Sequence, residues 1–322
     1  MEIIANTTDF YLARGKETAA AMGKFDGVHI GHRRLLEEIL SQKKRGAAAC
    51  VFTFDPPPAV LFGRRGEDVS VLSTKEEKRL LFERMGVDIL IEFPLNQETA
   101  AMSPEAFALE VLAERMNVAF LAAGSDLSFG AKGAGDAALL QRLGPKLGFE
   151  TRIIDKVCLR GIQVSSTLVR ERLERGDMEE VLQLLGMPYM IAGKVVEGKR
   201  IGRTLGFPTV NLLPRPEKKL PPRGVYFSQV RVRGKVYPAI SNVGCKPTVT
   251  DEAVMGVESY LYGFGESAYG EDIEVYLYSF RRPEKRFKDR EALRAQLQED
   301  IAAGESRYGG ILSKAEGKSR IF

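Results

Sequence analysis

The first half of the chain alternates short apolar runs with stretches of helical periodicity. From His32 onward, apolar residues recur at the three- and four-residue spacing of a helix, and Ser103 followed by Pro104 has the composition of a helix start. Strands are predicted at residues 18–25, 47–55, 87–93, 118–124 and 149–155, and helices at 32–40, 75–86 and 103–116. Such alternation predicts a parallel sheet covered by helices, which is a Rossmann-like α/β sandwich.

The pattern changes after two short helical stretches, 166–176 and 177–186, each of which ends in a glycine. From about residue 190, β-rich runs separated by Gly and Pro predict an antiparallel barrel or sandwich. These runs are 193–198, 224–232, 235–244, 257–264 and 273–280, and a final helix is predicted at 289–303. We therefore expect an α/β domain at 1–186, a β-barrel domain with a C-terminal helix at 187–310, and a tail at 311–322.

Composition narrows the class of protein. A chain of 322 residues with 44% hydrophobic residues is long enough for two domains. The net charge of +4 is small and the basic clusters are dispersed, so we expect no nucleic-acid partner. No apolar run approaches the ~20 residues of a membrane span, and the N-terminus has no secretory h-region, so no membrane partner is expected either. Three cysteines without a paired spacing argue against a disulfide framework or a zinc site and indicate a cytoplasmic protein.

The two histidines of the chain, His29 and His32, lie in one His-x-Gly-His unit at a predicted strand-to-helix junction. Gly31 allows the backbone to approach a ligand closely, and the following helix N-terminus favours negative charge. Two imidazoles at this spacing can bind phosphate oxygens of a nucleotide and stabilise charge at its α-phosphate. Taken alone, an arbitrary pair of histidines would more often be two surface residues. A metal site is disfavoured because a third histidine is lacking.

A second candidate site is the glycine-rich basic stretch GKRIGRTLGFPTVNL (198–212), which is not a Walker A loop. Its backbone N–H groups can surround phosphates. Thr209 and Asn211 are two residues apart, so their side chains share one face of an extended strand. Both present oxygen atoms, which Mg²⁺ prefers. The alternative is a β-turn with polar ends.

The string GKFDGVHIGH (23–32) resembles the HxGH signature of nucleotidylyltransferases, in the form found in bacterial bifunctional riboflavin kinase/FAD synthetases. FTFDPPP (52–58), GSDLSFG (124–130) and VSSTLVR (164–170) resemble three further segments of that family, with Leu127 in place of a usual Phe. The resemblance implies adenylylation of FMN by ATP, which yields FAD and pyrophosphate.

The same resemblance assigns roles in the first domain. His29, His32 and Arg170 are implied catalytic residues, with Arg170 as a cationic clamp on the leaving pyrophosphate. Asp126 and Phe129 are implied flavin-binding residues, although Asp126 is also compatible with a turn cap. The implied ATP- and phosphate-binding residues are Gly23, Phe25, Asp26, Gly31, Ser166 and Thr167. Without the other motifs, Ser166 and Thr167 would indicate only a helix N-cap.

Residues 198–212 resemble the riboflavin kinase motif, with Val210 in place of Ala, and 223–227, 241–249 and 268–287 resemble further segments of that family. The implied ATP-binding residues are Gly202, Thr204, Gly206, Pro208, Thr209 and Asn211, with Mg²⁺ on Thr209 and Asn211. Glu258 is the implied base for the riboflavin hydroxyl, and alternation places it on one strand face with Tyr260 and Tyr262.

Two residues depart from the kinase pattern, since Tyr260 stands where His is typical and Gly263 where Asp is typical. The leading hypothesis is an enzyme that phosphorylates riboflavin to FMN with ATP and then adenylylates FMN to FAD. One alternative is an FMN adenylyltransferase whose barrel binds flavin without turnover, and another is a flavin- or nucleotide-sensing module without catalysis. The resemblances extend over about residues 20–305.

Overall fold

The computed structural model describes residues 1–12, 16–57, 70–198, 206–247 and 253–312. The chain forms two compact units, Met1–Val69 with Lys78–Ser166, and Ser70–Glu77 with Thr167–Phe322. The division at Ser166 differs from the boundary expected near residues 186–187, and the short segment Ser70–Glu77 belongs to the second unit. The domain limits inferred from sequence stay a prediction.

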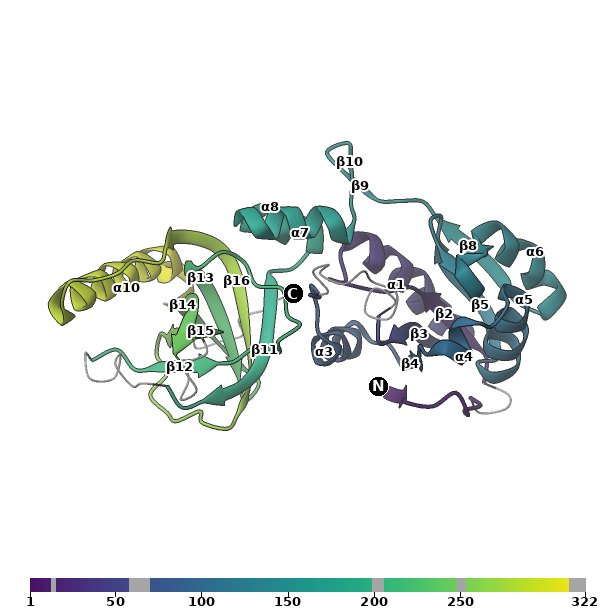
Figure 1. Ribbon diagram of the computed structural model, residues 1–322, viewed down its shortest axis with the longest axis horizontal. Helices are drawn as coiled ribbons and strands as arrows, with labels where there is room; N and C mark the ends of the chain where they lie inside the picture. The colour runs from purple at the N-terminus through teal and green to yellow at the C-terminus, as the bar shows by residue number, and fades with distance from the viewer. Residues whose placement is uncertain (13–15, 58–69, 199–205, 248–252, 313–322) are drawn as a thin grey trace. The chain divides into compact units, whose positions relative to one another are not determined.

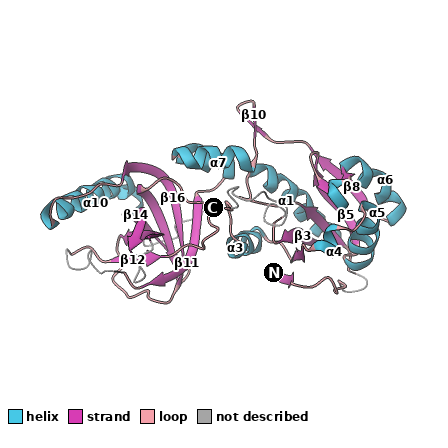
Figure 2. Ribbon diagram, viewed as in Figure 1, coloured by secondary structure: helices cyan, strands magenta, loops and turns pink. Residues whose placement is uncertain are grey.

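The first unit is built on a six-stranded parallel sheet, seen edge-on in Figures 1 and 2. Its strands, in spatial order, are β1 (Glu2–Ala5), β4 (Ile89–Pro94), β3 (Ala48–Asp55), β2 (Thr18–Met22), β5 (Val118–Gly124) and β8 (Glu150–Ile154). Every neighbouring pair runs parallel. The predicted Rossmann-like sheet is therefore confirmed, and β1 is an edge strand that the sequence patterns did not reveal.

Helices connect these strands. They are α1 (Ile30–Gln42), α3 (Lys75–Met85), α4 (Gln97–Ala100), α5 (Pro104–Ala106), its π-helical continuation Phe107–Arg115, and α6 (Ala137–Leu147). Ser103 caps α5 as predicted, because its side chain accepts a hydrogen bond from the Ala106 N–H. Short elements complete the unit: 3₁₀ turns at Lys43–Arg45 and Ala131–Gly133, the pair β6 (Ser128–Phe129) and β7 (Gly135–Asp136), and the hairpin β9 (Cys158–Leu159) and β10 (Ile162–Gln163).

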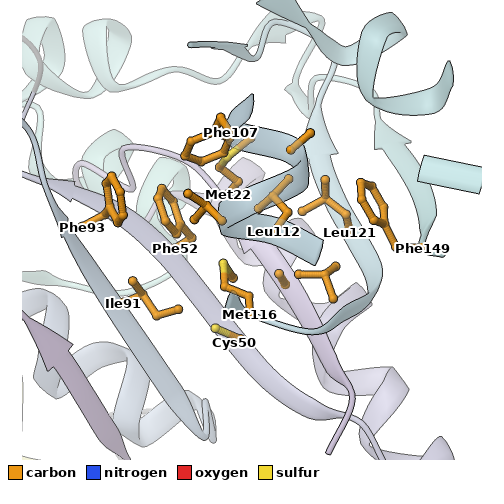
Figure 3. Close-up of a cluster of buried hydrophobic side chains, with 14 of the residues drawn as sticks. Met22, Cys50, Phe52, Ile91, Phe93, Phe107, Leu112, Met116, Leu121 and Phe149 are labelled. Atoms are coloured by element: carbon orange, nitrogen blue, oxygen red, sulfur yellow. The ribbon is translucent and has the colours of Figure 1, made fainter. Parts of the chain in front are cut away.

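The core of this unit lies between the sheet and the π-helical segment (Figure 3). All five residues of β2 are buried, as expected for a central parallel strand covered on both faces. Phe52 packs edge-on against Phe107 with ring centroids 5.4 Å apart, and Cys50 is fully buried. Burial raises the pKa of the Cys50 thiol, so this side chain behaves as a small hydrophobic residue.

The order of the strands determines where a ligand binds. Chain connections run from β2 outward in both directions, to β3 and β4 on one side and to β5 and β8 on the other. In open parallel sheets, ligands bind at the carboxyl ends of the strands where the order reverses. Here that position is the end of β2, which continues through residues 23–29 into α1.

The second unit is a closed barrel whose neighbouring strands are antiparallel, so the predicted barrel is confirmed. Its strands in order are β11 (Tyr189–Val196), β12 (Thr209–Leu212), β15 (Ala253–Leu261), β14 (Lys235–Pro247), β13 (Gly224–Val232) and β16 (Asp272–Pro283). The helices α7 (Ser166–Arg175) and α8 (Met178–Leu185) precede the barrel, and α10 (Arg290–Leu312) follows it. In the described residues, no helix is long and apolar enough to span a membrane.

Alternation along β15 and Tyr262, the residue that follows it, divides the side chains between two environments. Ser259 is fully buried and lies 2.7 Å from the Ser241 hydroxyl, which in turn lies 2.7 Å from that of Ser228. Tyr262 packs instead in a separate apolar cluster and donates a hydrogen bond to the Ile301 carbonyl of α10. The predicted alternation, with Glu258, Tyr260 and Tyr262 on one face, agrees with this arrangement.

Segment Ser70–Glu77 is anchored to the second unit through a buried ion pair. The Lys218 ammonium lies 2.6 Å from Glu77 Oε2, and each side chain is only 1% exposed. Lys218 also donates to the Leu72 carbonyl and lies 4.2 Å from the centre of the Tyr189 ring. Glu77 Oε1 accepts from the Ala192 N–H of β11, so this carboxylate joins the segment to the barrel.

Candidate active sites

The loop between β2 and α1 has an unusual backbone. Phe25, Gly27 and Val28 have φ angles of 50°, 83° and 45°, in the left-handed region that Phe and Val rarely occupy. Phe25 and Val28 are both fully buried, and the Phe25 ring packs between those of His32 and Phe82. Strained residues persist where surrounding packing holds them, and they are concentrated at functional sites. The loop is therefore a rigid approach to the start of α1.

His29 is the N-cap of α1. Its backbone is extended, and its Nδ1 accepts a hydrogen bond of 3.3 Å from the His32 N–H. The two imidazole rings stack with centroids 3.7 Å apart and planes inclined by 13°. A Cβ on Gly31 would lie 3.1 Å from two atoms of the His29 ring, so glycine leaves room for the ring to fold onto the helix end. The structure thus brings the predicted pair together at the N-terminus of a helix.

Both imidazoles are neutral at pH 7. Burial lowers the pKa of His29 to about 4, and its backbone hydrogen bond and Asp126 only partly oppose this effect. Burial also lowers the pKa of His32 well below its ordinary value, with smaller contributions from His29 and Lys78. Because Nδ1 of neutral His29 accepts a hydrogen bond, its proton is assigned to Nε2, which is then a donor.

Buried polar atoms beside these rings lack protein partners. Within the described part of the chain, His32 Nδ1 and the Nε and Nη2 atoms of Arg33 are buried without a hydrogen bond. Unpaired buried polar groups are rare in folded proteins. Desolvation lowers the pKa of the Arg33 guanidinium. Unsatisfied polar atoms at a helix N-terminus are compatible with an anion as ligand.

Ser166 is tied to the same loop, because its hydroxyl donates a 2.9 Å hydrogen bond to the Asp26 carbonyl. It is also the first residue of α7, so the predicted helix start is confirmed. Thr167 is exposed, and Arg170 donates to the Ser70 carbonyl at 2.8 Å. Thr167 and Arg170 belong to the second unit, and their phosphate-binding roles stay predictions.

The two residues expected to bind flavin lie in different environments. Asp126 is 67% exposed on its side chain and pairs with the Lys156 ammonium at 3.1 Å. Phe129 is only 3% exposed and packs in the core, with its ring centroid 5.7 Å from that of Phe107. Phe129 is therefore a core residue, and its contact with flavin stays a prediction.

The barrel gathers a second set of polar side chains. Asn211 lies opposite Glu258 on the neighbouring strand, and the Thr209 hydroxyl donates a 2.5 Å hydrogen bond to Glu258 Oε1. Asn211 is 7% exposed, and a Cβ on Gly198 would lie 2.5 Å from its amide nitrogen. The absence of a side chain on Gly198 therefore allows its backbone to lie directly over Asn211. Thr209, Asn211 and Glu258 therefore form one cluster, and the metal-binding and catalytic roles expected of them stay predictions.

A pocket of about 290 Å³ adjoins this cluster. Its walls come from β12 and from the loop between β15 and β16. The lining residues are Val195, Pro208, Thr209, Val210, Asn211, Leu261 and Phe264–Tyr269. The loop residues Phe264–Ala268 were not predicted as part of the site, although Phe264 and Tyr269 supply aromatic rings to a pocket already expected to bind a nucleotide. A loop with aromatic residues and three glycines, at 262–271, was the available signal.

Five residues of the kinase segments remain, namely three predicted ATP-binding residues and the two departures from the kinase pattern. Gly202 and Thr204 lie outside the described residues, whereas Gly206, with φ of 89°, forms a turn before Pro208. Gly263, one of the two departures from the kinase pattern, has φ of 72° and thus a conformation that favours glycine over aspartate. Tyr260, the other departure, packs against the rings of Phe207 and Tyr262.

Known proteins resemble both units. The FAD synthetase family pattern matches residues 13–168, and the riboflavin kinase pattern matches residues 185–307. A Listeria monocytogenes protein named bifunctional riboflavin kinase/FMN adenylyltransferase is 36% identical over 283 residues, 87% of this chain and 89% of that protein. The Escherichia coli K12 protein of the same name is 34% identical over 311 residues, 96% and 98% of the two chains.

A solved Streptococcus pneumoniae structure, described as a macrolide-efflux protein, has a TM-score of 0.80 and 26% identity over 94% of this chain and 98% of that one. This structural similarity extends over both units. The two family matches occur in the chain order expected from the motifs, and the two relatives are similar over almost their whole length. The chain belongs to the family of bifunctional riboflavin kinase/FMN adenylyltransferases.

Proposed function

We propose that this chain performs both reactions of its family, with the adenylyl transfer at the His29–His32 pair and the phosphorylation of riboflavin at the Thr209–Asn211–Glu258 cluster. In chain order, the first unit forms FAD from FMN and ATP, and the barrel forms FMN from riboflavin and ATP. The single observation that supports this division most strongly is the occurrence of two separate polar clusters, one within each family match.

In the adenylyl transfer, a phosphate oxygen of FMN attacks the α-phosphorus of ATP. The bond from that phosphorus to the bridging oxygen breaks, and pyrophosphate leaves. His29 Nε2–H and the N-terminus of α1 donate hydrogen bonds to the oxygens on which negative charge increases. The chemistry requires positioning and charge stabilisation without a covalent enzyme intermediate. The roles expected of Thr167 and Arg170 at the leaving pyrophosphate stay predictions, because both residues belong to the second unit.

In the kinase reaction, Glu258 accepts the proton of the riboflavin 5′-hydroxyl while the oxygen attacks the γ-phosphorus of ATP. ADP is the leaving group. The hydrogen bond from Thr209 fixes one carboxylate oxygen of Glu258, which leaves Oε2 to face the hydroxyl. The partly buried position of Glu258 beside Asn211 restricts its side chain further. Geometry thus supports Glu258 as the base.

The residues present are compatible with Mg²⁺. Thr209 and Asn211 present a hydroxyl and an amide group on one strand face, beside the Glu258 carboxylate, and hard oxygen ligands of this kind suit Mg²⁺. In the described residues, no group of three or more His, Cys, Asp or Glu side chains could hold a metal, so ATP phosphates would complete the coordination. When bound there, Mg²⁺ would neutralise charge on the phosphates.

The relatives' two-activity names and the intact Glu258–Thr209 contact favour a working kinase over a barrel that only binds flavin. We assign the protein to the cytoplasm, a compartment that suits three free cysteines and small-molecule substrates. We also expect no nucleic-acid partner, because the charge of +4 is small for a protein of this length.

Two variants in the full chain test this division. Riboflavin with ATP and Mg²⁺, and separately FMN with ATP and Mg²⁺, are incubated with each protein, and FMN and FAD are resolved by chromatography. Glu258→Gln is expected to lower FMN formation by about 10²–10⁴-fold while FAD formation from FMN continues. His29→Asn, which retains an N-cap, is expected to lower FAD formation while FMN accumulates. Loss of the same activity in both variants would refute the division, as would wild-type protein that forms neither product.

A further inference from the structure

The loop Tyr262–Glu271, between β15 and β16, forms one wall of the 290 Å³ pocket. Backbone hydrogen bonds fix both of its ends, from Tyr262 N to the Pro238 carbonyl and from Gly270 N to the Val195 carbonyl. Phe264, near its start, packs its ring 5.2 Å from that of Tyr237. The residues of the loop that line the pocket, 264–269, are also held by a side chain from outside the loop.

That side chain is Arg233, in the turn between β13 and β14. Its Nε and Nη2 donate to Glu271 Oε1 at 3.2 and 3.0 Å, and Nη2 also donates to the Ser267 carbonyl at 2.8 Å. Nη1 donates to Glu266 Oε2. One planar guanidinium therefore joins two carboxylates and one backbone carbonyl across the loop, and two of these three residues line the pocket.

The turn itself is shaped for this contact. Arg233 has φ of 49°, an uncommon conformation for a residue with a side chain, and the following Gly234 has φ of 76°. Arginine suits the position because its five N–H donors form a rigid fork, whereas a lysine ammonium is a single point charge. Arg233 touches the loop from outside the pocket and does not line the pocket itself.

We propose that Arg233 is a positioning residue for the kinase: it holds loop 264–269 in the conformation that closes the nucleotide pocket. The inference rests on the proposed assignment of Thr209 and Asn211 to ATP, since the same pocket contains both residues. A loop already held in its bound conformation loses less freedom when the ligand binds, so affinity rises without new contacts. Arg233 thus acts on ATP binding through the loop, and not on the phosphoryl transfer step.

An exposed ion pair that stabilises only the surface would give a different result. The Arg233 side chain is 45% exposed and that of Glu266 is 69% exposed, so salt screens their attraction. A purely structural pair would alter thermal stability slightly and leave the KM for each substrate unchanged. A positioning role raises the KM for ATP, leaves that for riboflavin unchanged, and is weakened by salt.

The test is steady-state FMN formation by the full chain, with ATP and riboflavin varied in turn. Arg233→Ala is expected to raise the KM for ATP about fivefold with kcat within about twofold, because ordering of the loop is then required during binding. Arg233→Lys, which keeps the charge but cannot reach all acceptors, is expected to lie between. Arg215→Ala, which removes another exposed arginine paired with Glu76, is the matched control and retains wild-type kinetics. FAD formation from FMN is the internal control for intact protein.

An unchanged KM for ATP, a lower kcat with unchanged KM, or an increase confined to the KM for riboflavin would each overturn the proposal. Should Arg233→Ala fail to fold, Glu271→Ala removes the principal acceptor and retains the arginine, with the same expected increase in KM. Failure of the underlying kinase assignment is recognised separately, because wild-type protein would then form no FMN or Glu258→Gln would retain full activity.

Discussion

Replacement of Glu77 by Gln is expected to destabilise the second unit strongly, because the Glu77 side chain is buried in an ion pair with Lys218. The change removes the negative charge beside Lys218, whose side chain is 1% exposed. Gln at this position keeps one oxygen. At the place of Glu77 Oε2 this oxygen still accepts from the Thr74 N–H, and the amide nitrogen then faces the Ala192 N–H, which donates to Oε1 in the wild type. Gln also keeps the reciprocal capping arrangement with Thr74 at the start of α3. The variant therefore removes the charge and the hydrogen bond with the Ala192 N–H while it retains the size and shape of the side chain.

The expected decrease in the free energy of unfolding is about 3–5 kcal/mol, as for other buried pairs that lose one partner. Deprotonation of the unpaired amine limits the cost, since neutralising an ordinary lysine at pH 7 costs about 4.6 kcal/mol. The Leu72 carbonyl and the Tyr189 ring still face the ammonium, so we expect the lower part of this range. For a unit of this size the melting temperature should fall by about 6–12 °C.

Heat inactivation of the full chain is a suitable assay, because its two activities report on the two units separately. FMN formation should be lost at a lower temperature in Glu77→Gln than in wild type. Glu76→Gln is the matched control: its 2.7 Å pair with Arg215 is exposed on both sides and should contribute at most about 1 kcal/mol. Glu77→Gln combined with Lys218→Met removes both charges and should recover much of the loss. Equal inactivation temperatures for the two single variants, or no recovery in the double variant, would refute the reasoning.

Two further predictions concern the first unit. The pKa of His29 is lowered to about 4, whereas an unfolded histidine titrates near 6.5, so the unfolded chain binds more protons between these two pH values. The free energy of unfolding should therefore fall by about 2 kcal/mol from pH 7 to pH 5. Urea titrations measure this decrease, which should be smaller in His29→Asn. Gly31→Ala should lower FAD formation about tenfold, because a Cβ would lie 3.1 Å from the His29 ring and displace it. Stability should not fall, because alanine favours a helix more than glycine does. FMN formation is the control, and unchanged FAD formation would contradict the prediction.

Long periodic segments allowed most of the fold to be predicted. The apolar runs at 47–55 and 118–124 correspond closely to β3 and β5, because parallel strands buried on both faces are continuously apolar. Strand β1 was missed because it is short and lies at the sheet edge with exposed residues. Helix α6 was missed although it is amphipathic, since Pro145 and Gly144 interrupt its sequence near the C-terminal end.

The candidate site residues could be predicted from the sequence where they belong to one contiguous motif. Contacts between residues far apart in the sequence could not be predicted in this way. His29 and His32 lie three residues apart, so the sequence alone placed both rings at one helix end. The contact of Arg233 with loop 264–271 depends on the pairing of β13 with β14 and β16, which no local pattern reveals. Glu77 lies in the helix predicted at 75–86, but no local pattern indicates that its carboxylate joins Ser70–Glu77 to the barrel.

The two departures from the kinase pattern also have local explanations that leave Glu258 in place. Tyr260 and Tyr262 belong to an aromatic group that ends on α10, where Tyr262 donates to the Ile301 carbonyl. A Cβ on Gly304 would lie 2.0 Å from the Tyr262 hydroxyl, so the helix approaches this strand closely. The hydrogen bond from Tyr262 thus ties the segment that directly follows β15 to α10, while the Thr209 hydroxyl holds the Glu258 carboxylate from the neighbouring strand. A tyrosine at position 260 contributes to that support, and a glycine at 263 allows the turn into the pocket loop.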